Sequence, residues 1–220
     1  MRSTFRIVTY CLVLSLGAGA LSTKAEKPGE PASSEAAQAE YLKKLDDRVG
    51  KIVSALGIQD EAKRARVHAL VVAQYRTLNS WHETNDARLK ELKKTSPKDG
   101  SPAADEISSL KNTLKQIHET FLTALGKDLS DAQIETIKDG MTVGKVQFTY
   151  KGYVQQIPSL TEEQKAKILE LLKEAREEAM DAGSMEEKSD IFNRYKGKIN
   201  NWLSKQGVDQ GSGKKKADKK

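Results

Sequence analysis

The sequence predicts an all-α fold, a helical bundle of about six helices with one long antiparallel hairpin and one irregular extended connector. Composition is the first indication, because only 5% of the residues are aromatic while Glu, Lys, Leu and Ala, which favour helices, are abundant. Periodicity is the second, since apolar residues recur at spacings of three and four through most of the chain. With 220 residues, the chain is long enough for one globular domain with terminal tails.

The N-terminus has the layout of a secretory signal peptide. Two arginines precede an apolar stretch at residues 7–16, and small residues follow, with cleavage expected after Ala20 or Ala25. We therefore expect residues 1–25 to be removed on export to the periplasm or the extracellular space. Cleavage also removes Cys11, the only cysteine, so the mature protein would have no disulfide, thiolate ligand or cysteine nucleophile.

The formal net charge of +6 comes from the two ends of the chain. Residues 1–25 contain three basic residues and no acidic one, and residues 205–220 contain six lysines and two aspartates. The body between them, residues 26–204, has 28 basic and 29 acidic residues, and this balance gives no support for nucleic acid as a partner. Residues 207–220, rich in Gly and Lys, predict a disordered tail after a helical domain at residues 34–206.

The helical domain is expected to begin with two long helices. Residues 26–33, rich in Pro and Ser, predict a flexible lead-in, and Ser34 is a suitable N-cap for a first helix that ends at Gly57. A second helix is expected from about Asp60 to Lys94, with an apolar stripe along one side. At 1.5 Å per residue this helix would be about 50 Å long, so a partner must cover its stripe.

A third helix should be that partner. The segment at residues 95–102 contains two prolines and a glycine, and it interrupts the helical pattern. Beyond it, apolar residues alternate spacings of three and four: Ile107, Leu110, Leu114, Ile117, Phe121 and Leu125. Such a seam packs against another helix, so we expect the second and third helices to form a long antiparallel hairpin.

Three further helices are expected after the hairpin. Ser130 caps a fourth helix that ends at Gly140, and Thr161 caps a fifth that ends at Gly183. A sixth follows, with aromatic and aliphatic residues at helical spacing, and ends at Gly207.

Residues 141–159, between the fourth and fifth helices, depart from this pattern. Val146, Phe148 and Tyr150 alternate with polar residues, and such alternation is typical of extended chain. Because no partner strand is available, we expect a mostly irregular connector that its aromatic residues hold across the bundle.

The connector supplies the candidate ligand-binding residues, which are Tyr150, Lys151, Tyr153, Gln155 and Gln156. Loops positioned by a rigid scaffold commonly carry function, and aromatic faces beside amides and lysines suit sugar rings. The alternative is that both tyrosines anchor the connector to the bundle, with their hydroxyls at its edge. For Trp81 and Trp202, which lie on apolar stripes, we expect core packing.

A second candidate is a metal site at His82 and Asp86. The segment between them is similar to the His-Glu-x-x-His helix of zinc peptidases, but Asp86 stands where the second histidine would be. Because the pattern marks no third ligand, we expect these side chains on a solvated or capping edge of the second helix, with no metal or other cofactor. No nucleophile elbow, phosphate-binding loop or dinucleotide fingerprint occurs in the sequence, so we do not expect an enzyme.

Two helix starts share a pattern: Leu129-Ser130-Asp131-Ala132-Gln133 and Leu160-Thr161-Glu162-Glu163-Gln164. The pattern resembles the paired Leu-Thr-x-x-Gln motifs of Spy/CpxP-type periplasmic proteins, which are helical ATP-independent chaperones and stress sensors. Its physical content is a helix N-cap with acidic residues in the first turn. The concave basic cradle of that family is not visible in this balanced sequence.

A longer resemblance covers most of the mature chain. It is carried by Tyr150-Lys151-Gly152-Tyr153, by Ile157-Pro158 before the second capping pattern, by Ala175-Arg176-Glu177 with Met180-Asp181-Ala182-Gly183, and by Tyr195-Lys196-Gly197-Lys198-Ile199-Asn200-Asn201. These segments resemble a family of secreted bacterial proteins known as a domain of unknown function and described as sugar-binding. The resemblance implies export, this fold and a sugar ligand, and it brings no catalytic residues.

From these observations we expect an exported, non-enzymatic protein that binds a carbohydrate or another extracytoplasmic polymer and is linked to polysaccharide utilisation. We expect no membrane span after signal cleavage, because no apolar run beyond the signal is long enough. A Spy-like periplasmic chaperone or stress-response protein is the alternative from another class, and a metal-binding helical protein is a further one. The ligand and the oligomeric state stay open.

Overall fold

The computed structural model describes residues 31–208, with side chains from residue 35 onward, and this part of the chain forms seven helices and no strand. The all-α prediction is therefore confirmed, with one helix more than expected. The helices are α1 Pro31–Ser54, α2 Glu61–Lys94, α3 Pro102–Leu125, α4 Asp131–Met141, α5 Lys145–Gln156, α6 Glu162–Met180 and α7 Met185–Lys205. Within the described range, no helix is long and apolar enough to cross a membrane.

The described residues divide into two units, residues 31–39 and residues 40–208. In the first unit, the described residues 31–39 form the start of α1. The last three residues of the expected flexible lead-in, 31–33, are thus helical, and α1 begins before the expected cap. The predicted signal peptide and the tail from residue 209 onward lie outside the described residues.

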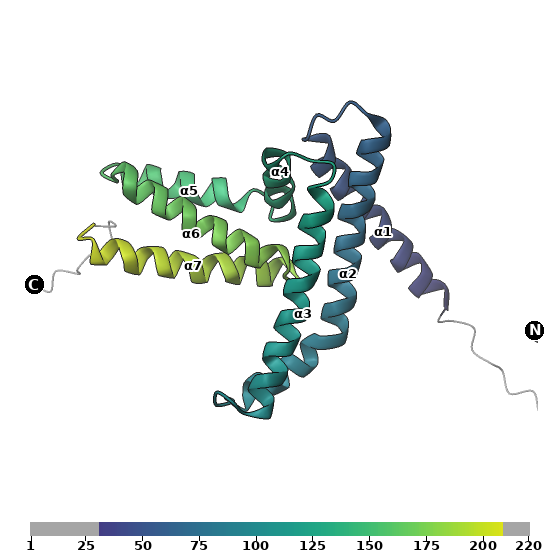
Figure 1. Cartoon of the computed structure of the whole chain (residues 1–220), viewed down its shortest axis with the longest axis horizontal. Helices are drawn as coiled ribbons and strands as arrows, with labels where there is room; N and C mark the ends of the chain where they lie inside the picture. The colour runs from purple at the N-terminus through teal and green to yellow at the C-terminus, as the bar shows by residue number, and fades with distance from the viewer. Residues whose placement is uncertain (1–30, 209–220) are drawn as a thin grey trace, which may run out of the picture. The chain divides into compact units, whose positions relative to one another are not determined.

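In the second unit, α2 and α3 form the predicted antiparallel hairpin and lie side by side (Figure 1). The Asp60 carboxylate caps α2 by accepting a hydrogen bond from the backbone N–H of Lys63 at 3.0 Å, and Ser101 caps α3 in the same way. A first hydrophobic core lies where α1, α2, α3 and α4 meet. Its fully buried members include Val49, Val67, Val71, Leu125 and Ile137.

The two Leu-[Ser/Thr]-x-x-Gln segments form capping boxes at the starts of α4 and α6. The Ser130 hydroxyl accepts from the Gln133 backbone N–H at 3.4 Å, and the Gln133 side chain accepts from the Ser130 backbone N–H at 3.2 Å. Thr161 and Gln164 repeat the arrangement. Two otherwise unpaired backbone donors are satisfied at each helix start, which gives both segments a local structural role.

The expectation of an irregular extended connector at residues 141–159 is wrong, because α5 occupies most of it. Gly144, with a φ of 63°, turns the chain between α4 and α5. Val146, Tyr150 and Tyr153 then recur at helical spacing and pack against a second core, formed by α5, α6 and α7. The alternation that suggested extended chain counted Phe148 among the aromatic residues that hold the connector on the bundle. The Phe148 side chain is 81% exposed and does not do so.

Helix α4 contacts α1 at a glycine. A Cβ added at Gly140 would lie 2.8 Å from Cγ1 of Ile52, closer than real Cβ contacts allow. Replacing Gly140 with alanine should lower the free energy of unfolding by about 1–3 kcal/mol, since the two helices must separate. Urea denaturation measures this change.

Gly197, in the interior of α7, is the matched control, because a Cβ added there would meet no atom within 4 Å. Gly197→Ala should raise the free energy of unfolding by about 0.5–1 kcal/mol through helix propensity alone. Equal stabilisation by both substitutions would contradict a close contact at Gly140.

Candidate functional site

Helix α5 carries a small concave site, the α5 pocket, to which α7 also contributes. Its volume is about 520 Å³. The residues that line it are Phe148, Thr149, Lys151, Gly152, Tyr153, Gln155 and Gln156 from α5, and Lys196 from α7. Phe148, Lys151, Gly152 and Gln155 share one face because the last three follow Phe148 by three, four and seven residues.

Four of the five predicted ligand-binding residues line this pocket: Lys151, Tyr153, Gln155 and Gln156. Tyr150 does not line it, because its position in α5 turns it toward the second core, against which it packs. Phe148 was not predicted. On a helix over residues 145–156, Phe148 shares a face with Lys151 and Gln155. The helical spacing of these three residues is the sequence signal that could have identified Phe148.

Tyr153 is half-buried between the pocket and α7. Its hydroxyl donates to Oδ1 of Asn200 at 2.7 Å and lies 3.3 Å from the backbone carbonyl oxygen of Lys196. Burial raises the pKa of Tyr153 to about 12. The expected anchoring role of this tyrosine is therefore present, and its ring still contributes to the pocket wall. By contrast, the side chains of Lys151, Gln155 and Gln156 make no hydrogen bond or ion pair with the described residues.

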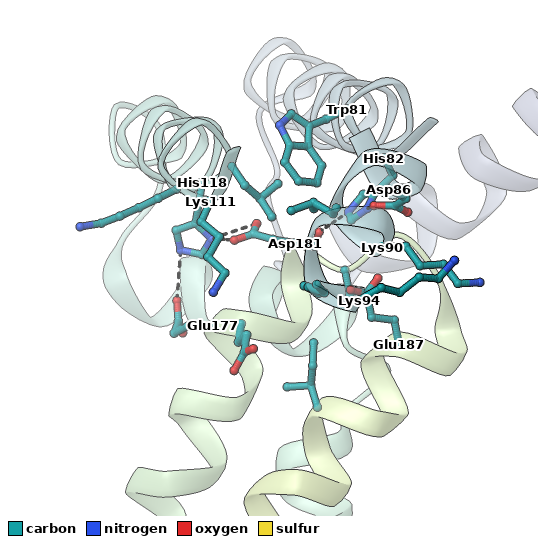
Figure 2. Close-up of a pocket in the computed structure, with 17 residues that line it drawn as sticks. Trp81, His82, Asp86, Lys90, Lys94, Lys111, His118, Glu177, Asp181 and Glu187 are labelled. Atoms are coloured by element: carbon teal, nitrogen blue, oxygen red, sulfur yellow. Dashed lines mark hydrogen bonds and ion pairs between the residues drawn. The ribbon is translucent and has the colours of Figure 1, made fainter. Parts of the chain in front are cut away.

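A larger concave site, the four-helix pocket, lies between the α2–α3 hairpin and the start of the α6–α7 turn (Figure 2). Its volume is about 930 Å³. The lining residues are Trp81, His82, Asp86, Leu89, Lys90, Lys93 and Lys94 from α2, Lys111, Leu114, Lys115 and His118 from α3, Glu177 and Glu178 from α6, Asp181 and Ala182 from the turn, and Glu187 and Ile191 from α7.

His118 connects α3 to α6 at one wall of the four-helix pocket (Figure 2). Its Nδ1 donates to Oδ2 of Asp181 at 2.9 Å, and its Nε2 lies 3.5 Å from Oε2 of Glu177. The hydrogen bond to Asp181, followed by the one to Glu177, raises the pKa of His118 to about 9. His118 is therefore a cation at neutral pH and is unsuited to act as a general base there.

Glu177 is the second anchor of this wall. Burial favours its neutral carboxyl, but hydrogen bonds from His118 and Lys138 outweigh burial and lower the pKa of Glu177 to about 2. The Lys138 ammonium lies 2.9 Å from Oε2 of Glu177. The wall is thus a fixed set of paired charges, with its carboxylates committed to protein donors.

His82 lies in the opposite part of the pocket. It is buried, so the solvated edge expected for the pair is wrong for His82, whereas the Asp86 side chain is 56% exposed. Its Nδ1 lies 2.9 Å from Oδ1 of Asp86, and its Nε2 lies 2.7 Å from the backbone carbonyl oxygen of Asp181. The ring also packs against Gly183, where an added Cβ would lie 2.7 Å from Cγ of His82. The Trp81 indole meets the His82 ring edge-on, at 5.0 Å between centroids.

These contacts bear on the predicted metal candidate. Both ring nitrogens of His82 face oxygen atoms of the protein, and Asp86 contributes one of them. Among residues 35–208, no group of three His, Cys, Asp or Glu side chains is arranged to hold a metal ion. The His82–Asp86 pair instead ties α2 to the turn between α6 and α7.

The two tryptophans have the surroundings expected of core residues. Trp81 is buried and lines the four-helix pocket, while Trp202 is partly buried against the second core. The association of Trp81 and His82 with His118 and Asp181 was not predicted, because these residues meet only through tertiary contacts between α2, α3 and the α6–α7 turn.

A family model described as "Protein of unknown function (DUF3826)" matches residues 42–220. No curated protein matches the chain.

Proposed function

We propose that this chain, which belongs to the DUF3826 family of proteins of unknown function, is an exported, non-enzymatic carbohydrate-binding protein that holds its ligand at the α5 pocket. The observation that carries the proposal is the exposed ring of Phe148, which lines a concave site beside unpaired amides and ammonium groups. The export part of the proposal depends on the N-terminal sequence, which lies outside the described residues.

The chemistry of the α5 pocket suits a sugar ring. One face of a pyranose is made of C–H groups and packs on an aromatic ring, while its hydroxyls need hydrogen-bond partners at the edge. The Phe148 ring can provide the apolar contact. Gln155 and Gln156 each offer an amide donor and acceptor, and Lys151 offers a further donor.

The α5 pocket is also held firmly in place. Val146 is buried in the second core, and the Tyr153 hydroxyl is bonded to α7 at Asn200. A site on a rigid helix loses little conformational entropy on binding, which favours recognition of a weakly binding ligand such as a sugar.

The Spy-like alternative receives no separate support from its motif. The Ser130–Gln133 and Thr161–Gln164 pairs are used within the chain as capping boxes. Helix starts of this kind occur in proteins of many functions, so the motif does not distinguish a chaperone from a sugar-binding protein. Suppression of the aggregation of an unfolded client at near-stoichiometric ratio would favour the chaperone alternative.

Phe148→Ala should weaken saccharide binding by about fivefold or more, because an aromatic contact of this kind is worth on the order of 1 kcal/mol or more. Binding is measured by glycan array and then by calorimetry with the plant or algal polysaccharide that binds best. The substitution should leave the free energy of unfolding within about 0.5 kcal/mol of the wild-type value, since the side chain is 81% exposed.

Two controls accompany this experiment. Phe148→Trp keeps an aromatic face and should retain binding. Met185→Ala removes another exposed apolar side chain, at the start of α7 and outside the α5 pocket, and should have no effect on binding. Absence of binding across the saccharide panel, or unchanged binding by Phe148→Ala, would overturn the proposal.

A further inference from the structure

We infer that the four-helix pocket is a second binding site, independent of the α5 pocket, for a small organic anion with an apolar body. The ligand's acidic group would be held by Lys90, Lys93 and Lys111, and its apolar part would lie against Leu89 and Leu114. The inference depends on two features of the lining, the pairing of its charges and its apolar surface.

The acidic residues of the four-helix pocket are already satisfied within the protein. Each of its five carboxylates lies within hydrogen-bonding distance of a nitrogen atom of the protein: Asp86 of His82, Asp181 of His118, Glu177 of Lys138, Glu178 of Arg194, and Glu187 of the Gly183 backbone N–H. Carboxylates with such partners attract a cationic ligand less strongly than free ones, because the partner already offsets part of their negative charge.

The lysines of the pocket are only partly paired. The Lys94 ammonium lies 2.7 Å from Oε1 of Glu91, and the Lys115 ammonium lies 3.6 Å from Oε1 of Glu119. The side chains of Lys90, Lys93 and Lys111 make no ion pair or hydrogen bond with the described residues. The unmatched charge of the pocket is therefore positive.

These lysines come from both helices of the hairpin. Figure 2 shows Lys111, from α3, on one side of the pocket and Lys90 and Lys94, from α2, on the other. An anionic group between them can accept charge-assisted hydrogen bonds from ammonium groups on two sides. Their long side chains can reach it without a change in the backbone.

The remaining lining is apolar. Leu89 and Leu114 are half-buried on the facing sides of the hairpin, and Ile191 is buried on α7. A small inorganic anion would leave this surface in contact with water, whereas an apolar body would cover it. The volume of about 930 Å³ is at the upper end of the range for small-molecule sites, so it can hold a body of one or two rings.

The test uses two fluorescent probes with the same ring system. Anilinonaphthalene sulfonate has an anionic group, and phenylnaphthylamine lacks it. The anionic probe should bind saturably at one site, and replacing Lys90, Lys93 and Lys111 together with glutamine should weaken its binding by about tenfold. The affinity for phenylnaphthylamine should not change in this variant, because the apolar lining is intact.

A second variant tests the apolar part of the site. Leu114→Gln should weaken the binding of both probes, because it places an amide where the ring system packs. Thermal denaturation of each variant shows that it is folded. Inorganic sulfate, compared with chloride at equal ionic strength, should displace the anionic probe poorly.

Matched substitutions control for overall charge and for the other pocket. Replacing Lys43, Lys51 and Lys127 with glutamine removes the same charge outside the four-helix pocket and should leave probe binding unchanged. Phe148→Ala should also leave it unchanged, which separates this inference from the proposed sugar site. The inference is overturned if the anionic probe does not bind, if the pocket variant binds it like the wild type, or if sulfate displaces it efficiently.

Discussion

Replacing Arg176 with alanine should lower the free energy of unfolding by about 3 kcal/mol. The Arg176 side chain is 2% exposed and joins α6 to α4. Its guanidinium donates to Asp139 and Glu135, each at 2.7 Å, and to Glu177 at 3.2 Å. Removal of the arginine leaves these carboxylates without their shared cation and leaves a cavity beneath α4.

Arg194→Ala is the matched control for this prediction. Arg194 is also on a helix and pairs with one carboxylate, Glu178, but its side chain is 53% exposed. Solvent screens such a pair, so the control should cost less than about 1 kcal/mol. Urea denaturation at neutral pH compares the two variants. Equal losses would show that burial of Arg176 does not set the size of its contribution.

The contribution of His118 to stability should disappear as the pH rises through about 9. The pKa of His118 rises from 6.5 in the unfolded chain to about 9 in the fold, mainly because of its hydrogen bond to Asp181. A group with a raised folded-state pKa stabilises the fold fully below its unfolded pKa, and this stabilisation is lost as the pH passes its folded pKa. The shift corresponds to about 3 kcal/mol.

The measurement compares the wild type with His118→Gln by chemical denaturation at about pH 6 and about pH 10. The difference in unfolding free energy between the two proteins should be large at the lower pH and smaller by about 3 kcal/mol at the higher one. The comparison is needed because Lys188 titrates in the same range with the opposite sign, since burial lowers its pKa to about 8. A difference that does not change with pH would contradict the prediction.

Acid should act on the same cluster through Glu177. Its pKa is lowered to about 2, so its contribution is present above about pH 4.5 and is lost as the pH falls toward 2. The His118 contribution begins to fall above about pH 6.5. The stabilisation by this cluster is therefore greatest between about pH 4.5 and 6.5.

Most of the fold could be predicted because its signals are local. Capping residues such as Asp60, Ser130 and Thr161 act within one helical turn, and the seam that ends at Leu125 repeats over about five turns. The failure at α5 has a physical reason. Over a few residues, the spacing of Val146, Phe148 and Tyr150 fits both an extended strand and a helix with one exposed aromatic residue. Burial of this segment against α6 and α7 favours the helix.

The candidate sites were predicted unequally. Lys151, Tyr153, Gln155 and Gln156 lie within one short helix, so their spacing in the sequence already keeps them together. The partners of His118 lie 59 and 63 residues away along the chain, and no local pattern marks them. The two paired lysines of the four-helix pocket have partners three and four residues away on the same helix, whereas Glu177 and Glu178 take their cations from other helices, which the sequence does not show.

By itself, the sequence determined that this protein is helical, where most of its helices begin and end, and that α2 needs a partner along its length. These properties follow from capping and from apolar periodicity, which act over a few turns. The tertiary structure decided that residues 145–156 are a helix, that His82 is buried, and that three lysines stay unpaired at a pocket among the described residues. Each of these depends on the burial and charge of groups distant in the chain, which only the packed helices bring together.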